Sequence, residues 1–205
     1  MQRLFAHRDG RFYLAALLLA NVGLLGGSVL MQGYYFPNRV LNGEFYRLIT
    51  HPFVHVSWLH LLLDGTAFLV LYAMLETPNW LKRTAYVLGA HLGCTAGVTL
   101  SLGWSESIGY AGLSGIAHGL MAVWALELLD QPDKTLWPIG TWTFIIVTFK
   151  ALYEAVFDRM VFDFMHSGLM GQPIAISHLS GIIGACIAFG LCRQWKTKSE
   201  VYHEI

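Results

Sequence analysis

Charged side chains are scarce in this sequence. Only 13% of its 205 residues are Asp, Glu, Lys or Arg, whereas soluble domains average about 25%. The formal net charge is zero, which argues against a nucleic-acid partner because nucleic-acid-binding proteins concentrate positive charge. Apolar residues make up 55% of the chain and the mean hydropathy is +0.51. The composition therefore indicates a protein that resides in a lipid bilayer.

Cysteine is also rare, with three residues in the chain. Cys94, Cys186 and Cys192 all lie in apolar runs and lack the spacing of metal ligands. They give no disulfide framework, and we expect them to pack as small apolar side chains. The sequence also contains no internal repeat, low-complexity segment or domain linker that would divide it.

Six apolar runs are each roughly as long as the 17–25 residues that cross a bilayer as a helix. A backbone exposed to lipid must satisfy its own hydrogen bonds, so all six runs should be helices. We therefore expect an all-α membrane protein, in which a membrane domain over 12–192 lies between an N-terminal segment, 1–11, and a C-terminal tail, 193–205. The runs are Phe12–Met31, His55–Leu75, Ala85–Leu102, Leu113–Leu129, Leu136–Phe157 and Pro173–Cys192.

Basic residues predict how the chain is oriented in the membrane. With the N-terminus in the cytoplasm, nine Lys and Arg residues fall on the inner side and three on the outer side, which is the bias that membrane proteins show. We therefore expect both termini to face the cytoplasm. The inner residues are Arg3, Arg8, Arg11, Lys82, Arg83, Lys134, Arg193, Lys196 and Lys198, and the outer ones are Arg39, Arg47 and Arg159.

Two of the expected helices carry a hydroxyl and an imidazole at the same depth. Ser114 lies in the first turn of the fourth run and His178 is the sixth residue of the last run. Both runs enter from the outer side, so at about 1.5 Å rise per residue both side chains fall in the outer third of the membrane. A histidine within hydrogen-bond reach can activate a serine as a nucleophile. Gly112 and Gly115 would let the backbone bend at Ser114, and Gly181 would let the last helix pack closely on the fourth.

Each of these features also has a simpler structural interpretation. A serine in a membrane helix usually bonds to its own backbone, and glycine-rich helices are usually packing faces. The second run adds His60 and Asp64 on one helix face, where they could stabilise a developing oxyanion or simply neutralise each other. A further alternative is a zinc or iron site, because imidazole and carboxylate suit those metals; its ligands would be His60, Asp64, His118 and His178.

Four motifs, in order along the chain, resemble those of the rhomboid intramembrane serine proteases. The resemblance covers about residues 45–184. It implies a six-transmembrane-helix bundle, a Ser-His dyad without a third carboxylate, no metal or cofactor, and cleavage of membrane-anchored proteins near the outer surface. The motifs are Arg47 in the first outer loop, His60 with Asp64 as a HxxxN-like pair, Gly112 to Gly115 as GxSG, and His178 followed by Gly181.

The resemblance implies a role for each of these positions. Ser114 would be the nucleophile and His178 the general base, while His60 and the Ser114 backbone N–H would line the oxyanion hole. His118 stands where many rhomboids have an aromatic residue that stacks on the catalytic histidine. Asp64 replaces the family's asparagine, and an ionised carboxylate there would repel the tetrahedral intermediate. It therefore favours an alternative, a catalytically silent rhomboid-like protein that binds transmembrane helices.

A narrower resemblance is to the rhombosortases, a bacterial branch of the rhomboids. It rests on the compact length, on GLSGIAHGL with its histidine at position 118, and on the polar segment FKALYEAVFD in the fifth run. The branch implies a location in the bacterial inner membrane and the processing of secreted proteins that carry a C-terminal sorting tail. Within the polar segment, Lys150 and Glu154 are four residues apart, so we expect them to pair with each other.

Overall fold

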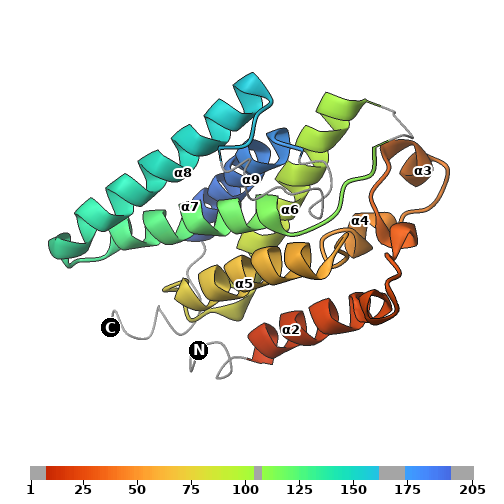
Figure 1. The fold of residues 1–205 in the computed structure, drawn as a ribbon. Coiled ribbons are helices and arrows are strands. Elements are labelled where there is room, and N and C mark those ends of the chain that lie inside the picture. Colours follow the sequence, from red (N-terminus) through yellow and green to blue (C-terminus); the bar gives the residue numbers. More distant parts are fainter. Residues whose placement is uncertain (1–7, 104–107, 162–173, 195–205) are drawn as a thin grey trace.

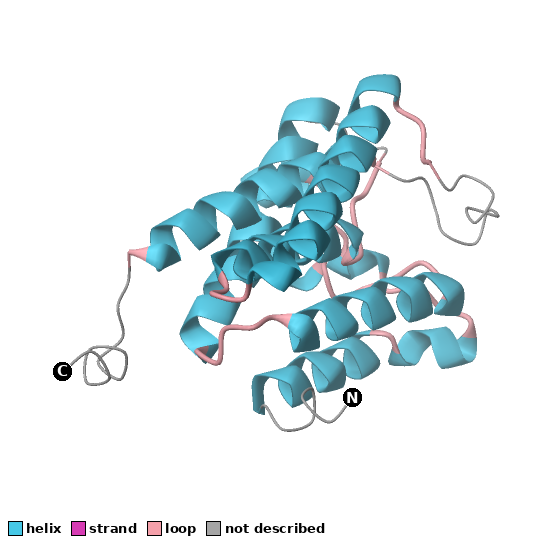
Figure 2. Cartoon of the chain, turned by 90° about the vertical axis from the view of Figure 1, so that its left-hand side faces the viewer, coloured by secondary structure: helices cyan, strands magenta, loops and turns pink. Residues whose placement is uncertain are grey.

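The protein folds as a bundle of helices in the computed structural model, which describes residues 8–103, 108–161 and 174–194, with the side chains of residues 8, 9 and 102 excepted. Within these ranges the chain forms helices and loops, apart from an isolated β-bridge between Tyr35 and Tyr110 (Figure 2). The all-α fold class is therefore confirmed. The helices are α2 (Arg8–Ala20), η1 (Val22–Gly26), η2 (Met31–Gly33), α3 (Pro37–Leu41), α4 (Arg47–Thr50), α5 (Trp58–Met74), α6 (Trp80–Leu102), α7 (Ser114–Asp130), η3 (Lys134–Leu136), α8 (Trp137–Phe157) and α9 (Ile176–Arg193).

Helix α7 lies in the middle of the bundle (Figure 1). It packs against α5, α6, α8 and α9, while α2 packs on α5. Leu120, Ala122 and Val123 of α7 are fully buried, as expected for an apolar helix that is covered by neighbours all round. Residues at the start of α7 are consequently within reach of side chains from several helices.

Glycines bring α9 close to two neighbouring helices. A Cβ atom at Gly115 of α7 would lie 2.7 Å from the Ser177 carbonyl oxygen of α9, and one at Gly181 of α9 would collide with the Gly115 carbonyl oxygen. Towards α6, a Cβ atom at Gly89 would lie 2.6 Å from the Gly184 carbonyl oxygen. Any side chain at these glycines would push the helices apart, so the glycines determine how closely the first turns of α7 and α9 approach.

The helices are shorter than the expected membrane crossings in several places. Lys134–Phe157 and Ile176–Arg193 are long and apolar enough to cross a bilayer, whereas Gly10–Gly26 and Trp58–Met74 are shorter apolar helical segments. The number of six crossings therefore stays a prediction. Residues 1–7, residues 195–205 and Pro173, where the last crossing was expected to begin, lie outside the described residues.

The first expected crossing, Phe12–Met31, is wrong in its second half because helix α2 ends at Ala20. The next residue, Asn21, is buried and donates from Nδ2 to the carbonyl oxygens of Leu17 (2.8 Å) and Phe53 (2.7 Å), while its Oδ1 accepts the His55 N–H (2.9 Å). These bonds satisfy backbone groups of a distant loop at the point where the helix stops. The chain then continues as a 3₁₀ turn instead of an α-helix.

Side-chain caps explain where two further helices begin. Helix α5 starts at Trp58, after the expected His55, because the Ser57 hydroxyl accepts the His60 N–H at 3.1 Å. Helix α6 starts at Trp80, before the expected Ala85, because the Asn79 side chain accepts the N–H groups of the first turn. Helices α7, α8 and α9 begin within a few residues of the expected positions.

The Arg47 side chain organises the loop between α2 and α5. It is 1% exposed and donates to the carbonyl oxygens of Gln32 (2.6 Å) and Tyr34 (2.7 Å) and to the Glu44 carboxylate (2.6 Å). A guanidinium group can satisfy several acceptors at once because its donors point in fixed, diverging directions. Arg47 therefore binds the backbone of its own loop.

Candidate active site

The loop before α7 places Ser114 at the first position of that helix. Gly112 has a φ angle of 103°, and a Cβ atom there would lie 2.7 Å from Asp64 Oδ2 and 2.9 Å from the His60 ring. Its N–H donates to the His51 carbonyl oxygen at 3.0 Å. Both the backbone conformation and the lack of space require glycine at this position. The loop therefore holds Ser114 close to His60 and Asp64.

His178 lies in the first turn of α9 and is 4% exposed. Its Nε2 atom is 3.1 Å from Ser114 Oγ, so the structure brings the two candidate catalytic residues within hydrogen-bond distance. Its Nδ1 atom is 2.7 Å from Glu154 Oε2 on α8. Because an ionised carboxylate only accepts, Nδ1 carries the proton and Nε2 presents its lone pair to the serine hydroxyl. This is the arrangement in which an imidazole can act as the base for a serine.

Glu154 has a second partner besides the expected one. Lys150 Nζ lies 2.8 Å from Glu154 Oε2, as the spacing predicted. The same oxygen also accepts from His178, and the other carboxylate oxygen accepts the Val161 N–H at 3.0 Å. Spacing along the sequence did not reveal the contact with His178, although an ionisable residue in a membrane helix signals a functional role. The expected pairing with Lys150 already neutralised the charge of Glu154, so no further partner was predicted.

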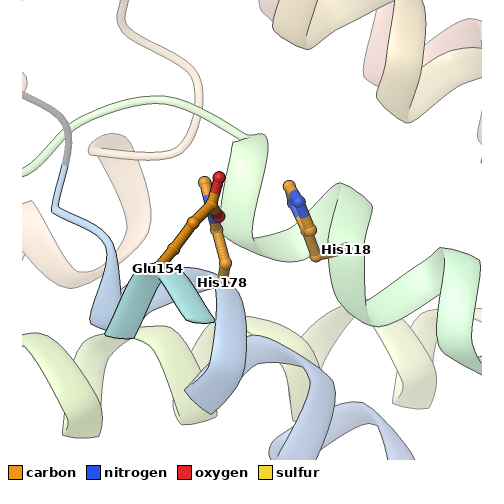
Figure 3. A group of neighbouring side chains, drawn as sticks. All are labelled: His118, Glu154 and His178. Carbon is orange, nitrogen blue, oxygen red and sulfur yellow. The ribbon is translucent and has the colours of Figure 1, made fainter. Parts of the chain in front are cut away.

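His118 lies one turn after Ser114 on α7 and stacks on His178. The ring centroids are 3.9 Å apart and the planes differ by 12°. Nδ1 of His118 is 2.7 Å from the Ser114 carbonyl oxygen, and Nε2 is 2.9 Å from Lys150 Nζ. Since a carbonyl oxygen only accepts, Nδ1 donates to it and Nε2 accepts from the lysine ammonium. Figure 3 shows how His118, Glu154 and His178 converge from α7, α8 and α9.

Asp64 lies against the start of α7 and is 6% exposed. Its Oδ2 atom accepts the backbone N–H groups of Leu113 (2.9 Å) and Ser114 (3.0 Å) and is 3.1 Å from His60 Nε2. A carboxylate is favoured at a helix N-terminus, where N–H groups have no partner within the helix. The Ser114 N–H that was expected to bind an oxyanion is thus donated to Asp64, and the mutual pairing of His60 with Asp64 is also present.

The residues considered for a metal site do not all come together. Among the described side chains, His118, Glu154 and His178 form a group whose ligand atoms lie within 4.8 Å of one another (Figure 3). His60 and Asp64 do not belong to that group. The Lys150 ammonium lies 2.9 Å from His118 Nε2 and 2.8 Å from Glu154 Oε2, so a cation of the protein itself already bonds to two of the three ligand groups.

Comparison with known proteins identifies the family. Residues 42–194 match the rhomboid domain. The chain is also similar to rhomboid-type serine protease 2 of Yarrowia lipolytica (strain CLIB 122 / E 150), with 27% identity over 148 residues that cover 69% of this chain and 50% of the relative. The chain thus matches about half the length of that relative. Because the rhomboid match extends over most of its length, this chain belongs to the rhomboid domain family of integral membrane proteins, which includes serine proteases that act on membrane proteins.

Proposed function

We propose that this protein is an intramembrane serine endopeptidase that cleaves membrane-anchored proteins near the outer face of the membrane. The observation that carries the proposal is the distance of 3.1 Å between Ser114 Oγ and His178 Nε2. Both groups belong to the first turns of α7 and α9, and the histidine has the tautomer that a base requires. The rhomboid family match and the similarity to a rhomboid-type serine protease support the same activity.

In this mechanism Ser114 Oγ attacks the scissile carbonyl carbon while His178 Nε2 takes the hydroxyl proton. His178 then returns that proton to the leaving amine as the C–N bond breaks, and a water molecule hydrolyses the acyl-enzyme. His60 and the Ser114 N–H stabilise the oxyanion. For this, the Ser114 backbone N–H and the His60 Nε2–H, which now lie 3.0 Å and 3.1 Å from Asp64 Oδ2, must both exchange that bond for one to the substrate oxygen.

The narrower choice of substrate rests on the resemblance to rhombosortases. On that basis the substrates are secreted proteins with a C-terminal sorting tail, the protein resides in the bacterial inner membrane, and both termini face the cytoplasm. The exposed side of α8 carries large apolar side chains, among them Trp142, Ile146 and Phe149. Such a surface suits contact with lipid or with an apolar substrate helix.

The second candidate function is that of a silent rhomboid-like protein that binds transmembrane helices. The observation that favours it is Asp64, whose carboxylate accepts the Ser114 N–H and so places negative charge beside the position where an oxyanion would form. A carboxylate that stays there would oppose the transition state of acyl transfer. The protein would then keep the fold and the Ser114–His178 contact without the reaction.

Labelling with a fluorophosphonate probe tests the proposal, because the probe reacts covalently with an activated serine. The parent protein, purified in detergent, is compared with Ser114→Ala, His178→Ala and Asp64→Asn, and thermal unfolding shows that each variant is folded. Labelling of the parent that disappears in both Ser114→Ala and His178→Ala is the expected result. Labelling seen in Asp64→Asn but not in the parent would instead support the silent protein. If the parent and all variants are folded and none of them labels, the protein is neither an active protease nor a protease silenced by Asp64.

A further inference from the structure

We infer that Glu154 is the third member of a Ser114–His178–Glu154 triad, in which it positions His178, and that Lys150 holds Glu154 in that role. The inference rests on the proposed serine protease function and adds to it. The family resemblance implies a dyad with no third carboxylate, so this arrangement is a departure of this chain. Glu154 is a positioning residue in this account, because it acts on the reaction through His178.

A hydrogen bond 2.7 Å long joins His178 Nδ1 to Glu154 Oε2. Glu154 is fully buried and His178 nearly so, so no bulk water competes for this bond. A carboxylate at Nδ1 places the proton there, leaves Nε2 free to accept from Ser114 Oγ, and stabilises the imidazolium that forms when the serine proton is transferred. A carboxylate that only neutralised Lys150 would need no contact with the histidine.

Both oxygens of Glu154 have fixed donors. Oε2 accepts from His178 Nδ1 and from Lys150 Nζ (2.8 Å), and Oε1 accepts the Val161 N–H (3.0 Å). One donor from α9, one from the preceding turn of α8 and one from the segment after α8 leave the carboxylate a single orientation. A carboxylate held in this way restrains the imidazole ring that bonds to it.

The charge of Lys150 also fits this role. Its ammonium compensates the Glu154 carboxylate, so a neutral His178 leaves the cluster with no net charge in a medium that disfavours unpaired charge. Lys150 also donates to His118 Nε2 at 2.9 Å, and His118 in turn donates to the Ser114 carbonyl oxygen at 2.7 Å. The hydrogen bonds thus form a closed ring that begins and ends at Ser114.

The test compares fluorophosphonate labelling rates of Glu154→Gln, Glu154→Asp and Lys150→Met with the parent between pH 5 and 9. Glu154→Gln keeps the shape of the side chain but allows the wrong histidine tautomer, and a general base that cannot accept the proton loses a contribution of about 100-fold to 10,000-fold to the rate. We expect a loss in that range and partial recovery in Glu154→Asp. The charged or ionisable groups that face His178 are Glu154 and Lys150 from α8, His118 from α7 and Asp64 from α5, while Cys94 of α6 donates to the carbonyl oxygen of the preceding residue, Ser177.

The pH at which labelling is half-maximal separates positioning from general damage. Removing the carboxylate in Glu154→Gln makes the imidazolium less stable, so this pH should fall. Removing the ammonium in Lys150→Met makes the imidazolium more stable, so it should rise. Glu127→Gln is the matched control, because Glu127 is a buried carboxylate at the other end of α7 that accepts the N–H groups of Glu76 and Thr77; it should lower stability without moving this pH.

The outcomes distinguish this inference from the proposed function. If the parent labels in a way that needs Ser114 and His178, but the folded Glu154→Gln variant keeps the parent rate and half-maximal pH, the triad is wrong and the protease remains. If Glu154→Gln does not fold, Lys150→Met decides: an unchanged half-maximal pH overturns the inference and a rise supports it. If the parent does not label at all, the proposed function itself has failed.

Discussion

The imidazole rings of His118 and His178 lie face to face, with centroids 3.9 Å apart and planes that differ by 12°. One ring covers the other, so it shields the candidate base from solvent and limits rotation about its side-chain bonds. His118 also links the Ser114 carbonyl oxygen to Lys150 through its two nitrogens. Its stacking role and its hydrogen-bonding role can therefore be separated by substitution.

Replacing His118 by phenylalanine should keep the stacking and lose the hydrogen bonds, while replacement by alanine should lose both. Aromatic pairs contribute about 0.5–1.5 kcal/mol beyond burial, which corresponds to about 2-fold to 12-fold in rate. We expect His118→Phe to label faster than His118→Ala by a factor in this range. His91→Ala is the control, since His91 stacks on His51 with centroids 4.9 Å apart and contacts neither candidate catalytic residue. Equal rates for the two His118 variants would show that stacking is unimportant.

Gly112→Ala should disturb the candidate active site by a steric clash in addition to backbone strain. The φ angle of 103° disfavours alanine by about 1–3 kcal/mol, and the new Cβ atom would also meet Asp64 Oδ2 at 2.7 Å. Gly43→Ala is a matched control, because its φ angle is 99° and no atom lies within 4 Å of the added Cβ. We expect both variants to unfold at lower temperature, but only Gly112→Ala to lose fluorophosphonate labelling. Full labelling of Gly112→Ala would mean that His60 and Asp64 can move away without harm.

Alanine substitutions at two glycines of α9 should change the thermal stability in opposite directions. At Gly181 a Cβ atom would collide with the Gly115 carbonyl oxygen, whereas at Gly190 it would meet nothing within 4 Å. Overpacking costs about 1–3 kcal/mol, and a glycine in an exposed helix interior is less stable than alanine by about 1 kcal/mol. Thermal unfolding in detergent should therefore show destabilisation for Gly181→Ala and slight stabilisation for Gly190→Ala. A stabilised Gly181→Ala would contradict the close approach of α7 and α9.

Much of the helical layout was accessible from sequence because long apolar runs are strong signals. Ser114 and His178 could be placed at one depth from their positions in two such runs, and the structure brings them together. The end of α2 at Ala20 was not accessible, because it depends on bonds from Asn21 to Phe53 and His55. No local pattern encodes contacts over such separations.

The contacts of Asp64 and Glu154 with other helices were likewise not predictable from local sequence patterns. Each already had a partner four residues away along its own helix, His60 for Asp64 and Lys150 for Glu154, and both pairings are present. The additional contacts, from Asp64 to the Ser114 N–H and from Glu154 to His178, join different helices. They follow from helix packing, which spacing within one helix does not determine.

Substituting Arg47 should loosen the loop between α2 and α5. Arg47→Met would leave the carbonyl oxygens of Gln32 and Tyr34 without their donor, and each lost hydrogen bond to a charged group costs about 1.5–3 kcal/mol. The variant should unfold at lower temperature, and limited proteolysis should cut between α2 and α5 faster than in the parent. Arg39→Met is the control, because the Arg39 guanidinium lies over the ring of Phe36 and takes no part in the hydrogen bonds that Arg47 makes to Gln32 and Tyr34. Unchanged proteolysis of Arg47→Met would mean that other contacts hold the loop.

The contact between Arg47 and Glu44 also predicts a pH dependence. Hydrogen bonding from Arg47 lowers the pKa of Glu44 below its ordinary value of 4.5. Because the folded-state pKa is depressed, the stabilisation is fully present above the unfolded pKa and is lost as the pH falls through the folded pKa. As the pH falls from 7 to 3, the unfolding temperature of the parent should therefore decrease relative to that of Glu44→Gln. A constant difference across this range would contradict a stabilising role for the ionised carboxylate.

Removal of metal ions should leave the activity intact. The group that could hold an ion is His118, Glu154 and His178, and Lys150 Nζ lies within 2.9 Å of His118 Nε2 and 2.8 Å of Glu154 Oε2. A divalent cation would have to displace this ammonium against strong repulsion at short distance. Fluorophosphonate labelling should accordingly be the same after dialysis against EDTA or 1,10-phenanthroline, and added zinc should not raise it. Loss of labelling on chelation that zinc restores would instead require Lys150 to move away and the three ligands to bind metal in the working protein. Lys150→Met should then bind zinc more tightly than the parent, because the competing charge has been removed.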